Sequence, residues 1–368
     1  MAVPTETIWK LEPHTGAKHQ ILGKYLDAWF PILGSFNKKL VYVDGFAGPG
    51  CYLDGEPGSP IIALQSALRH TDTLTGDPEF WFIEEDRDRV AQLEIEIQRL
   101  TIPKNFIVKI DHGTFADKFK AALDTSDRDG TRLAPTFALI DPFGFSGIPY
   151  ELIKRVLLRN KCEVLITFMV DSINRWLTHP EEGVRDHITE TFGTSEALDI
   201  AFGTGDRATA LKNLYLRQIK KVARFVRYFE MRDRDNRVVY YLFFATNNPL
   251  GHVKMKESMW KVDPMGDFRF SDATNPDQQV MFNEPPTAGL AYDLAAHFGD
   301  KLQMKIAAVE EYVQDDTAYL RKHMGDALKL LEKNGTLDIA ETKSDGTKRR
   351  EGTYPNTALV RFKSPRIE

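Results

Sequence analysis

The chain contains very little cysteine. Cys51 and Cys162 are the only two cysteines among 368 residues, which excludes a disulfide framework. No cysteine–histidine cluster has the spacing of a zinc site, so we expect no bound metal. No apolar run approaches the roughly 20 residues that span a bilayer, and the N-terminal residues lack the basic region and apolar core of a secretion signal. We therefore expect a cytoplasmic protein that does not associate with a membrane.

An excess of positive charge is also lacking. The formal net charge is −5, so any binding to nucleic acid must come from local patches. The hydrophobic share of 42% and the charged share of 27% lie in the ordinary range of soluble globular proteins. The length suffices for a doubly wound domain of about 250 residues and a smaller second domain.

Four apolar runs each end in an acidic residue, at intervals typical of βαβα alternation. The four acids are Asp44, Glu84, Asp111 and Asp141. This alternation predicts a parallel sheet covered on both faces, with ligands bound beyond the carboxyl ends of the strands. The order is typical of an α/β, Rossmann-like class I methyltransferase, which uses S-adenosyl-L-methionine (SAM).

The organisation along the chain suggests two domains. We predict a SAM-methyltransferase-like domain over 1–270, with a helical insertion at about 172–222. A linker at 271–287 leads to a C-terminal winged-helix-like domain over 288–368, where three helical patterns precede two strands. The predicted strands are 39–44, 79–83, 106–110, 136–140, 163–170, 225–231, 238–246, 336–342 and 358–363, and the C-terminal helices are 288–298, 302–313 and 317–333.

The first glycine-rich turn would hold the methionine end of SAM. Glycine admits positive φ and lets backbone N–H groups approach a ligand. The candidate residues of this turn are Asp44, Gly45, Phe46, Gly48 and Gly50. A dinucleotide would use similar geometry, but it requires a G-x-G-x-x-G spacing that is absent here.

Acids after the second and third strands complete the predicted cofactor site. Glu84 is the first candidate for the ribose hydroxyls and Glu85 the second, while Asp111 and Gly113 would flank the adenine. The alternative is that these acids merely cap strand ends.

The segment Asp141-Pro142-Phe143-Gly144 suggests the chemistry. An aromatic exocyclic amine is a poor nucleophile, and a site that alkylates it accepts hydrogen bonds from the NH₂ group. The Asp141 carboxylate and the Pro142 carbonyl can do this, and Phe143 can stack on the base. Alternatively, this is an Asp-Pro turn with Phe143 in the core.

Basic segments leave a second question open. Residues 217–237 carry eight basic side chains with interleaved aromatics, which fits either a nucleic-acid patch or a solvated hairpin. Residues 348–350 (Lys-Arg-Arg) would lie at the tip of the wing, which is the turn between the predicted strands 336–342 and 358–363. Asp171, at the end of the fifth predicted strand, either lines the predicted ligand site at the carboxyl ends of the strands or caps the helix that follows it.

Several of these motifs together resemble the three-Cys-motif partner protein (TcmP) family, bacterial proteins with the methyltransferase fold. The resemblance covers nearly the whole chain and rests on the segments 15–22, 43–50, 83–86, 139–144, 328–335 and 349–352. It implies a partner, a radical-SAM-like protein with three cysteines from a neighbouring gene.

Two other families share pieces of the chain. The Lys18-His19 helix ahead of a D-x-x-A-G-x-G turn is similar to bacterial rRNA adenine-amine methyltransferases, which places Lys18 among the catalytic candidates. Their Asp-Pro-Pro-aromatic motif is matched only in its first half. Asp-Pro-Phe-Gly is instead similar to the tRNA guanine-N2 dimethyltransferases. Both families methylate exocyclic amines.

We therefore expect SAM-dependent N-methylation of a nucleobase in RNA or DNA. Two alternatives are a non-catalytic or SAM-sensing partner of the radical-SAM-like protein, and a small-molecule methyltransferase.

Overall fold

The computed structural model describes residues 4–144, 148–263, 268–272, 287–299, 301–340 and 349–364. It divides into two compact units, one of Met1–Ser258 with Arg269–Asn275 and the other of Met259–Phe268 with Pro276–Glu368. Most of the predicted linker lies outside the described residues, as does the wing segment 341–348 that includes Lys348. Each unit has its own hydrophobic core.

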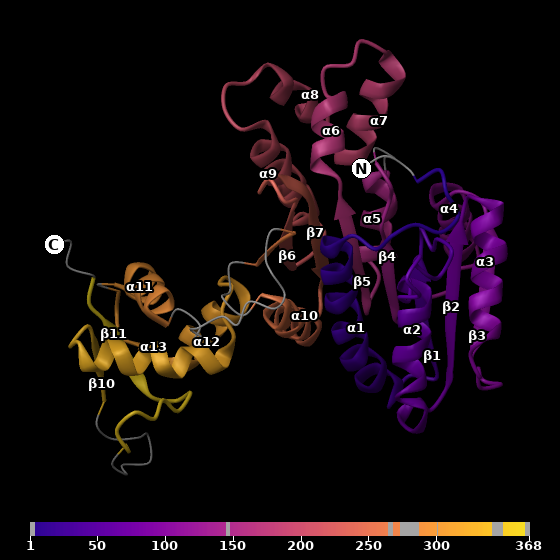
Figure 1. The fold of residues 1–368 in the computed structure, drawn as a ribbon. Helices are drawn as coiled ribbons and strands as arrows, with labels where there is room; N and C mark the ends of the chain where they lie inside the picture. The colour runs from indigo at the N-terminus through magenta and orange to yellow at the C-terminus, as the bar shows by residue number, and fades with distance from the viewer. Residues whose placement is uncertain are drawn as a thin grey trace. The chain divides into compact units, whose positions relative to one another are not determined.

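The first unit is built on an eight-stranded sheet with the order β3-β2-β1-β4-β5-β7-β6-β8 (Figure 1). The first five strands in the chain are parallel, whereas β7 is antiparallel to both β5 and β6. The strands are β1 (Lys39–Asp44), β2 (Asp77–Glu84), β3 (Ile107–His112), β4 (Thr136–Ile140), β5 (Cys162–Phe168), β6 (Phe225–Arg232), β7 (Val238–Thr246) and β8 (Arg269–Ser271).

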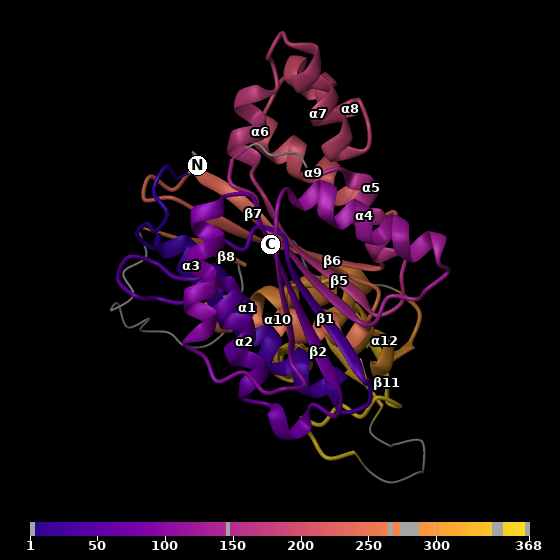
Figure 2. The same cartoon turned by 90° about the vertical axis from the view of Figure 1, so that its right-hand side faces the viewer.

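Helices cover both faces of this sheet. Figures 1 and 2 show α1, α2 and α3 on one face and α4 and α5 on the other. Because both faces are covered, every residue of β4 and β5 is buried, which explains their unbroken apolar sequences. The bounds are α1 (Pro13–Gly34), α2 (Ser59–Leu68), α3 (Arg87–Gln98), α4 (Phe115–Arg128) and α5 (Tyr150–Leu157).

The predicted insertion is helical. It follows β5 as α6 (Val170–Trp176), α7 (Glu182–Phe192), α8 (Glu196–Asp199) and α9 (Arg207–Ile219), and its buried side chains join the core on the α4–α5 face. The prediction missed α10 (Pro249–Val262). It also ended the third strand at residue 110, whereas β3 continues to His112 and therefore includes Asp111.

From residue 287 onward, the described part of the second unit contains α11, α12 and α13 and a three-stranded sheet of order β10-β11-β9. The predicted start of the middle helix at residue 302 was wrong, because residues 304 and 305 pair with β11 and the helix begins only at Ile306. The elements are α11 (Thr287–Phe298), β9 (Met304–Lys305), α12 (Ile306–Asp315), α13 (Arg321–Lys333), β10 (Leu337–Ile339) and β11 (Leu359–Phe362).

The strand order and directions of the first unit match a Rossmann-like methyltransferase fold. Within the part of the chain that the structure describes, no helix is both long and apolar enough to cross a bilayer. The same residues bring together no group of three or more metal-ligating side chains.

Candidate functional site

The four predicted acids lie at one edge of the sheet. Asp44 and Glu84 are the last residues of β1 and β2, Asp111 is the second-last residue of β3, and Asp141 directly follows β4. Because these strands are parallel and in register, their carboxyl ends meet at the same edge. This is where ligands bind in doubly wound sheets.

Glu84 links the second strand to the glycine-rich turn. Its side chain is buried, Oε2 accepts a 2.8 Å hydrogen bond from the Gly48 N–H, and Oε1 accepts one of 2.9 Å from the Asp86 N–H. A carboxylate has about four lone-pair sites, so two remain for further donors such as a diol. Glu85 is exposed, and Asp86 caps the start of α3.

The three glycines of the turn serve different purposes. A Cβ on Gly45 would lie 2.4 Å from the Phe115 ring, so packing requires glycine there. Gly50 has a φ of +79°, and a Cβ there would lie 2.8 Å from Leu93, so its backbone conformation favours glycine and its packing adds to that. Gly48 has a φ of +63°, and a Cβ added there would have the Trp9 ring as its nearest neighbour, at 3.8 Å. Of the three, Gly48 has the most open surroundings.

Asp44 is an internal support of the same turn. It is fully buried and accepts hydrogen bonds of 3.3 Å from the Phe46 N–H and from the Tyr42 hydroxyl. Burial raises its pKa to about 7, with a smaller contribution from the charge of Asp141 and against the effect of a bond from Ser59. Its carboxyl therefore braces the turn from inside.

Asp111 and Gly113 lie beside this turn. Asp111 Oδ2 accepts a 2.8 Å bond from the Trp81 indole N–H. The Gly113 N–H donates to the backbone oxygen of Glu84 at 2.9 Å, and Gly113 has a φ of +144°. The ring of Phe46 lies 5.8 Å from that of Phe115, which supplies an apolar surface next to these polar groups.

Lys18 and Asp141 form an ion pair between α1 and the end of β4. Their side chains are 5% and 19% exposed. Burial alone would raise the pKa of Asp141, but the charge and hydrogen bond of Lys18, with smaller contributions from Thr167 and His19, together outweigh burial and hold this pKa below its usual value. Burial and the adjacent Lys18 lower the pKa of His19 to about 3, so that imidazole is neutral. The pair thus presents an ionised carboxylate at neutral pH.

Sequence reasoning missed an aromatic group around Phe143. The Trp9 ring contacts Phe143 edge-on, with centroids 5.4 Å apart, and contacts Tyr52 at 5.9 Å. The Arg89 guanidinium lies 4.9 Å from the Trp9 ring and 5.7 Å from the Phe143 ring. Phe143 is partly exposed, whereas Pro142 is buried. The one available signal was Trp9, a tryptophan shortly before the first helix.

Part of the basic stretch 217–237 is ion-paired within the chain. Arg217 pairs with Glu196, Arg232 with Glu230, and Arg237 with Asp233 and Asp235. Asp171 lies in the first turn of α6 and pairs with Arg175 at 2.6 Å rather than with the Lys18–Asp141 pair.

No family model matches the chain, and no curated protein matches it in sequence. Among solved structures, a protein from Legionella pneumophila is 13% identical, with 68% of this chain and 91% of that chain covered and a TM-score of 0.41. The O-methyltransferase from Bacillus cereus, in complex with S-adenosylhomocysteine, is 11% identical over 61% and 80%, with a TM-score of 0.34.

Trm1 from Pyrococcus horikoshii, in complex with SAM, is 12% identical to this chain. The match covers 99% of this chain and 94% of that chain, with a TM-score of 0.35. The structural neighbours thus include methyltransferases in complex with SAM or S-adenosylhomocysteine.

Proposed function

We propose that this chain is a SAM-dependent methyltransferase that modifies an exocyclic amine of a nucleobase in RNA or DNA. The observation that carries the proposal is the ionised Asp141 carboxylate, held by Lys18 at the same sheet edge as Glu84 and the glycine-rich turn. One edge therefore offers groups for a cofactor and for a target amine.

The residues present fit SAM. Glu84 keeps two free lone-pair sites for the ribose hydroxyls, Asp111 keeps one oxygen beyond its bond to Trp81, and Phe46 offers an apolar surface. The open surroundings of Gly48 suit the methionine end. SAM would supply an electrophilic methyl group on a sulfonium. Because SAM has no phosphate group, its site does not need the helix N-terminus that binds the phosphates of a dinucleotide.

Asp141 and Pro142 would activate the amine. As the amine nitrogen takes up the methyl group, the bond from that methyl to the sulfonium sulfur would break and leave a neutral thioether. The nitrogen would become tetrahedral and positively charged, its N–H bonds would become more acidic, and one N–H proton would leave to Asp141 or to water. The Asp141 carboxylate and the Pro142 carbonyl would accept hydrogen bonds from these N–H groups and stabilise the developing positive charge. Lys18 keeps Asp141 ionised and oriented, and Phe143 would stack on the base.

The test begins with calorimetry of SAM and S-adenosylhomocysteine binding to the folded protein. We expect affinity in the micromolar range, about −8 kcal/mol. Nucleosides from cells that express wild type or Asp141→Ala would then be compared by mass spectrometry. Asp141→Ala should lower the methyl mark by roughly 10²–10³-fold while SAM affinity stays within a few fold, because Asp141 faces the amine rather than the cofactor.

Two outcomes would contradict the proposal. Absence of binding heat with both ligands would remove the cofactor and the enzyme assignment. A wild-type-dependent mark that persists in well-folded Asp141→Ala would show that this segment is not catalytic.

A second candidate is a SAM-sensing partner of a three-Cys-motif radical-SAM-like protein. The observation that favours it is that Asp141 and Glu84 already have partners within the chain. In this proposal the second unit, with three helices and a small sheet, is a winged-helix-like contact module. Stable co-purification with that partner and no change in any nucleoside would favour this candidate.

A further inference from the structure

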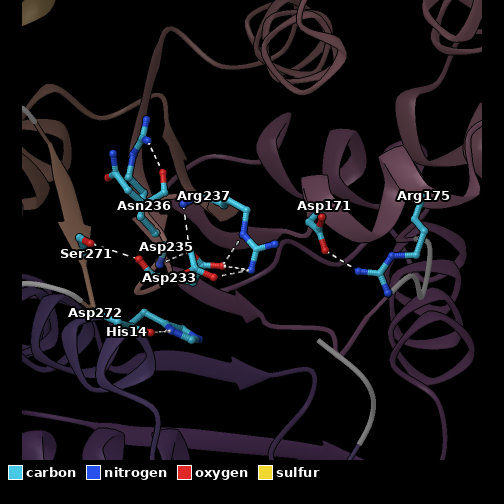
Figure 3. A network of polar contacts seen from close by, with 10 residues as sticks. His14, Asp171, Arg175, Asp233, Asp235, Asn236, Arg237, Ser271 and Asp272 are labelled. Atoms are coloured by element: carbon cyan, nitrogen blue, oxygen red, sulfur yellow. Dashed lines mark hydrogen bonds and ion pairs between the residues drawn. The ribbon is translucent and has the colours of Figure 1, made fainter.

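A cleft of about 530 Å³ lies in the first unit between α6, the turn that joins β6 to β7, and the start of α1. Figure 3 shows its side chains, with Asp171 and Arg175 on α6 and Asp233 and Arg237 on the turn. His14 of α1 and Asp272 also line it. The cofactor and amine assignments above use none of these groups.

His14 and Asp272 form a buried dyad in this cleft. His14 is 5% exposed, and its Nδ1 lies 2.8 Å from Asp272 Oδ2 (Figure 3). In the tautomer whose Nδ1–H donates to this carboxylate, Nε2 carries the lone pair of the ring. Among the described residues, neither His14 Nε2 nor Asp272 Oδ1 has a hydrogen-bond partner. A buried polar atom without a partner costs about 1–3 kcal/mol, so the dyad points to a ligand.

The dyad lies one helical turn from the Lys18–Asp141 pair. His14 and Lys18 are neighbours on one face of α1, at the spacing i, i+4. Tyr240 lies against both, because its ring centroid is 5.5 Å from that of His14 and 5.6 Å from Lys18 Nζ. A ligand in the cleft would therefore adjoin the site proposed for the target amine.

The charges of the cleft indicate what it would hold. Its lining carries five carboxylates and three guanidinium groups, so its net charge is negative. Two of the arginines are neutralised locally, since Arg175 pairs with Asp171 at 2.6 Å and Arg237 pairs with Asp233 at 2.9 Å. Such a lining repels phosphate, whereas hydrogen-bond acceptors in excess of free donors suit an uncharged heterocycle that carries an amino group.

We propose that this cleft binds an amino-bearing nucleobase of the substrate, with His14 Nε2 accepting a hydrogen bond from the base. The proposal rests on the proposed function and gives it a second binding site for the nucleic acid. Asp272 is a positioning residue that fixes the tautomer of His14. The phosphate backbone would run outside the cleft.

The test is a titration of the full chain, labelled with ¹⁵N at histidine, followed by NMR of the ring nitrogens. Guanosine, adenosine and cytidine carry an exocyclic amine, and uridine is the matched control without one. We expect the His14 Nε2 signal to shift with at least one of the three amino-bearing nucleosides and to stay in place with uridine.

His14→Gln should weaken the binding of that nucleoside about tenfold. His70→Gln, away from the cleft, should leave its binding unchanged.

Asp272→Asn provides a second readout, because it should redistribute the two tautomers of His14 and weaken the binding of the same nucleoside. It also assigns the His14 signal if His14→Gln does not fold. Protein that binds SAM but shows no shift with any amino-bearing nucleoside at millimolar concentration would overturn the inference and leave the proposed function standing. An equal shift with uridine would also overturn it. A selective shift in protein that does not bind SAM would support the cleft while the proposed function fails.

Discussion

Replacing Lys18 with methionine should destabilise the first unit strongly at neutral pH. Met is close to Lys in length and lacks the charge, so the variant leaves the Asp141 carboxylate in a mostly buried position without a counter-charge. Removing one partner of a buried ion pair costs about 3–5 kcal/mol, because the remaining charge is uncompensated. Since Asp141 keeps 19% exposure, we expect a value of about 3 kcal/mol, at the lower end.

A double-mutant cycle isolates the pair. Asp141→Asn alone should also be destabilising, because it leaves a buried ammonium without its partner. The double variant Lys18→Met/Asp141→Asn should lose clearly less than the sum of the two single losses, with a coupling of about 1–3 kcal/mol. Urea unfolding followed by tryptophan fluorescence suits this measurement, because four of the five tryptophans (Trp9, Trp29, Trp81 and Trp176) lie in the first unit.

The pH dependence supplies the sharper criterion. In the wild type, Lys18 depresses the pKa of Asp141. The pair therefore contributes stability above the unfolded pKa of about 3.9, and this contribution is lost as pH falls through the folded pKa. In Lys18→Met, burial without a counter-charge raises the pKa of Asp141. The folded variant then binds its proton more tightly than the unfolded chain, so the loss relative to wild type should be largest near pH 8 and shrink toward pH 5.

A loss below about 1 kcal/mol at pH 7, or additivity in the cycle, would refute this reasoning. So would a loss that stays constant between pH 5 and pH 8. Each of these results would mean that Asp141 reaches enough water to be stable as an unpaired ion.

Three further predictions concern the cofactor site. Glu84→Gln should weaken SAM binding in calorimetry by roughly 10- to 100-fold, because one acceptor for the ribose hydroxyls becomes a donor, whereas the exposed Glu85→Gln should leave it unchanged; equal effects would contradict the assignment. Asp44→Asn should raise the melting temperature at pH 8 but not at pH 5, because a carboxyl with a folded pKa of about 7 loses stability as pH rises from about 4 to 7; a gain independent of pH would rule this out. Trp9→Ala should weaken SAM binding roughly tenfold by removing an aromatic contact over Gly48, and wild-type affinity in that variant would place the N-terminal segment outside the site.

The sequence by itself determined the parallel half of the sheet. Buried parallel strands are unbroken apolar runs, and their boundaries are marked by acids and glycines. The bounds of β1 and β4 were therefore predicted to the residue, and those of β2 and β5 to within two residues. It also determined that Asp44, Glu84, Asp111 and Asp141 meet at one edge, because that follows from parallel direction alone.

Local sequence patterns were less informative where strand pairing or side-chain burial depends on residues that are far apart in the sequence. The α10 helix was missed, since several of its polar residues, such as His252 and Lys256, are buried and blur the helical periodicity. The start of α12 was misplaced because residues 304 and 305 pair with β11, more than fifty residues later in the chain.

Only the tertiary structure decided which side chains meet. It showed that the acids have different roles. Asp44 is buried and accepts a hydrogen bond from the Phe46 N–H of the turn, whereas Glu84 accepts one from the Gly48 N–H. It also brought together pairs that no sequence spacing predicts: Lys18 with Asp141, 123 residues apart, and His14 with Asp272, 258 residues apart. Such contacts depend on how α1 packs across the sheet. Burial then sets their electrostatics, because the pKa of a carboxyl depends on its distance from water and from the nearest opposite charge.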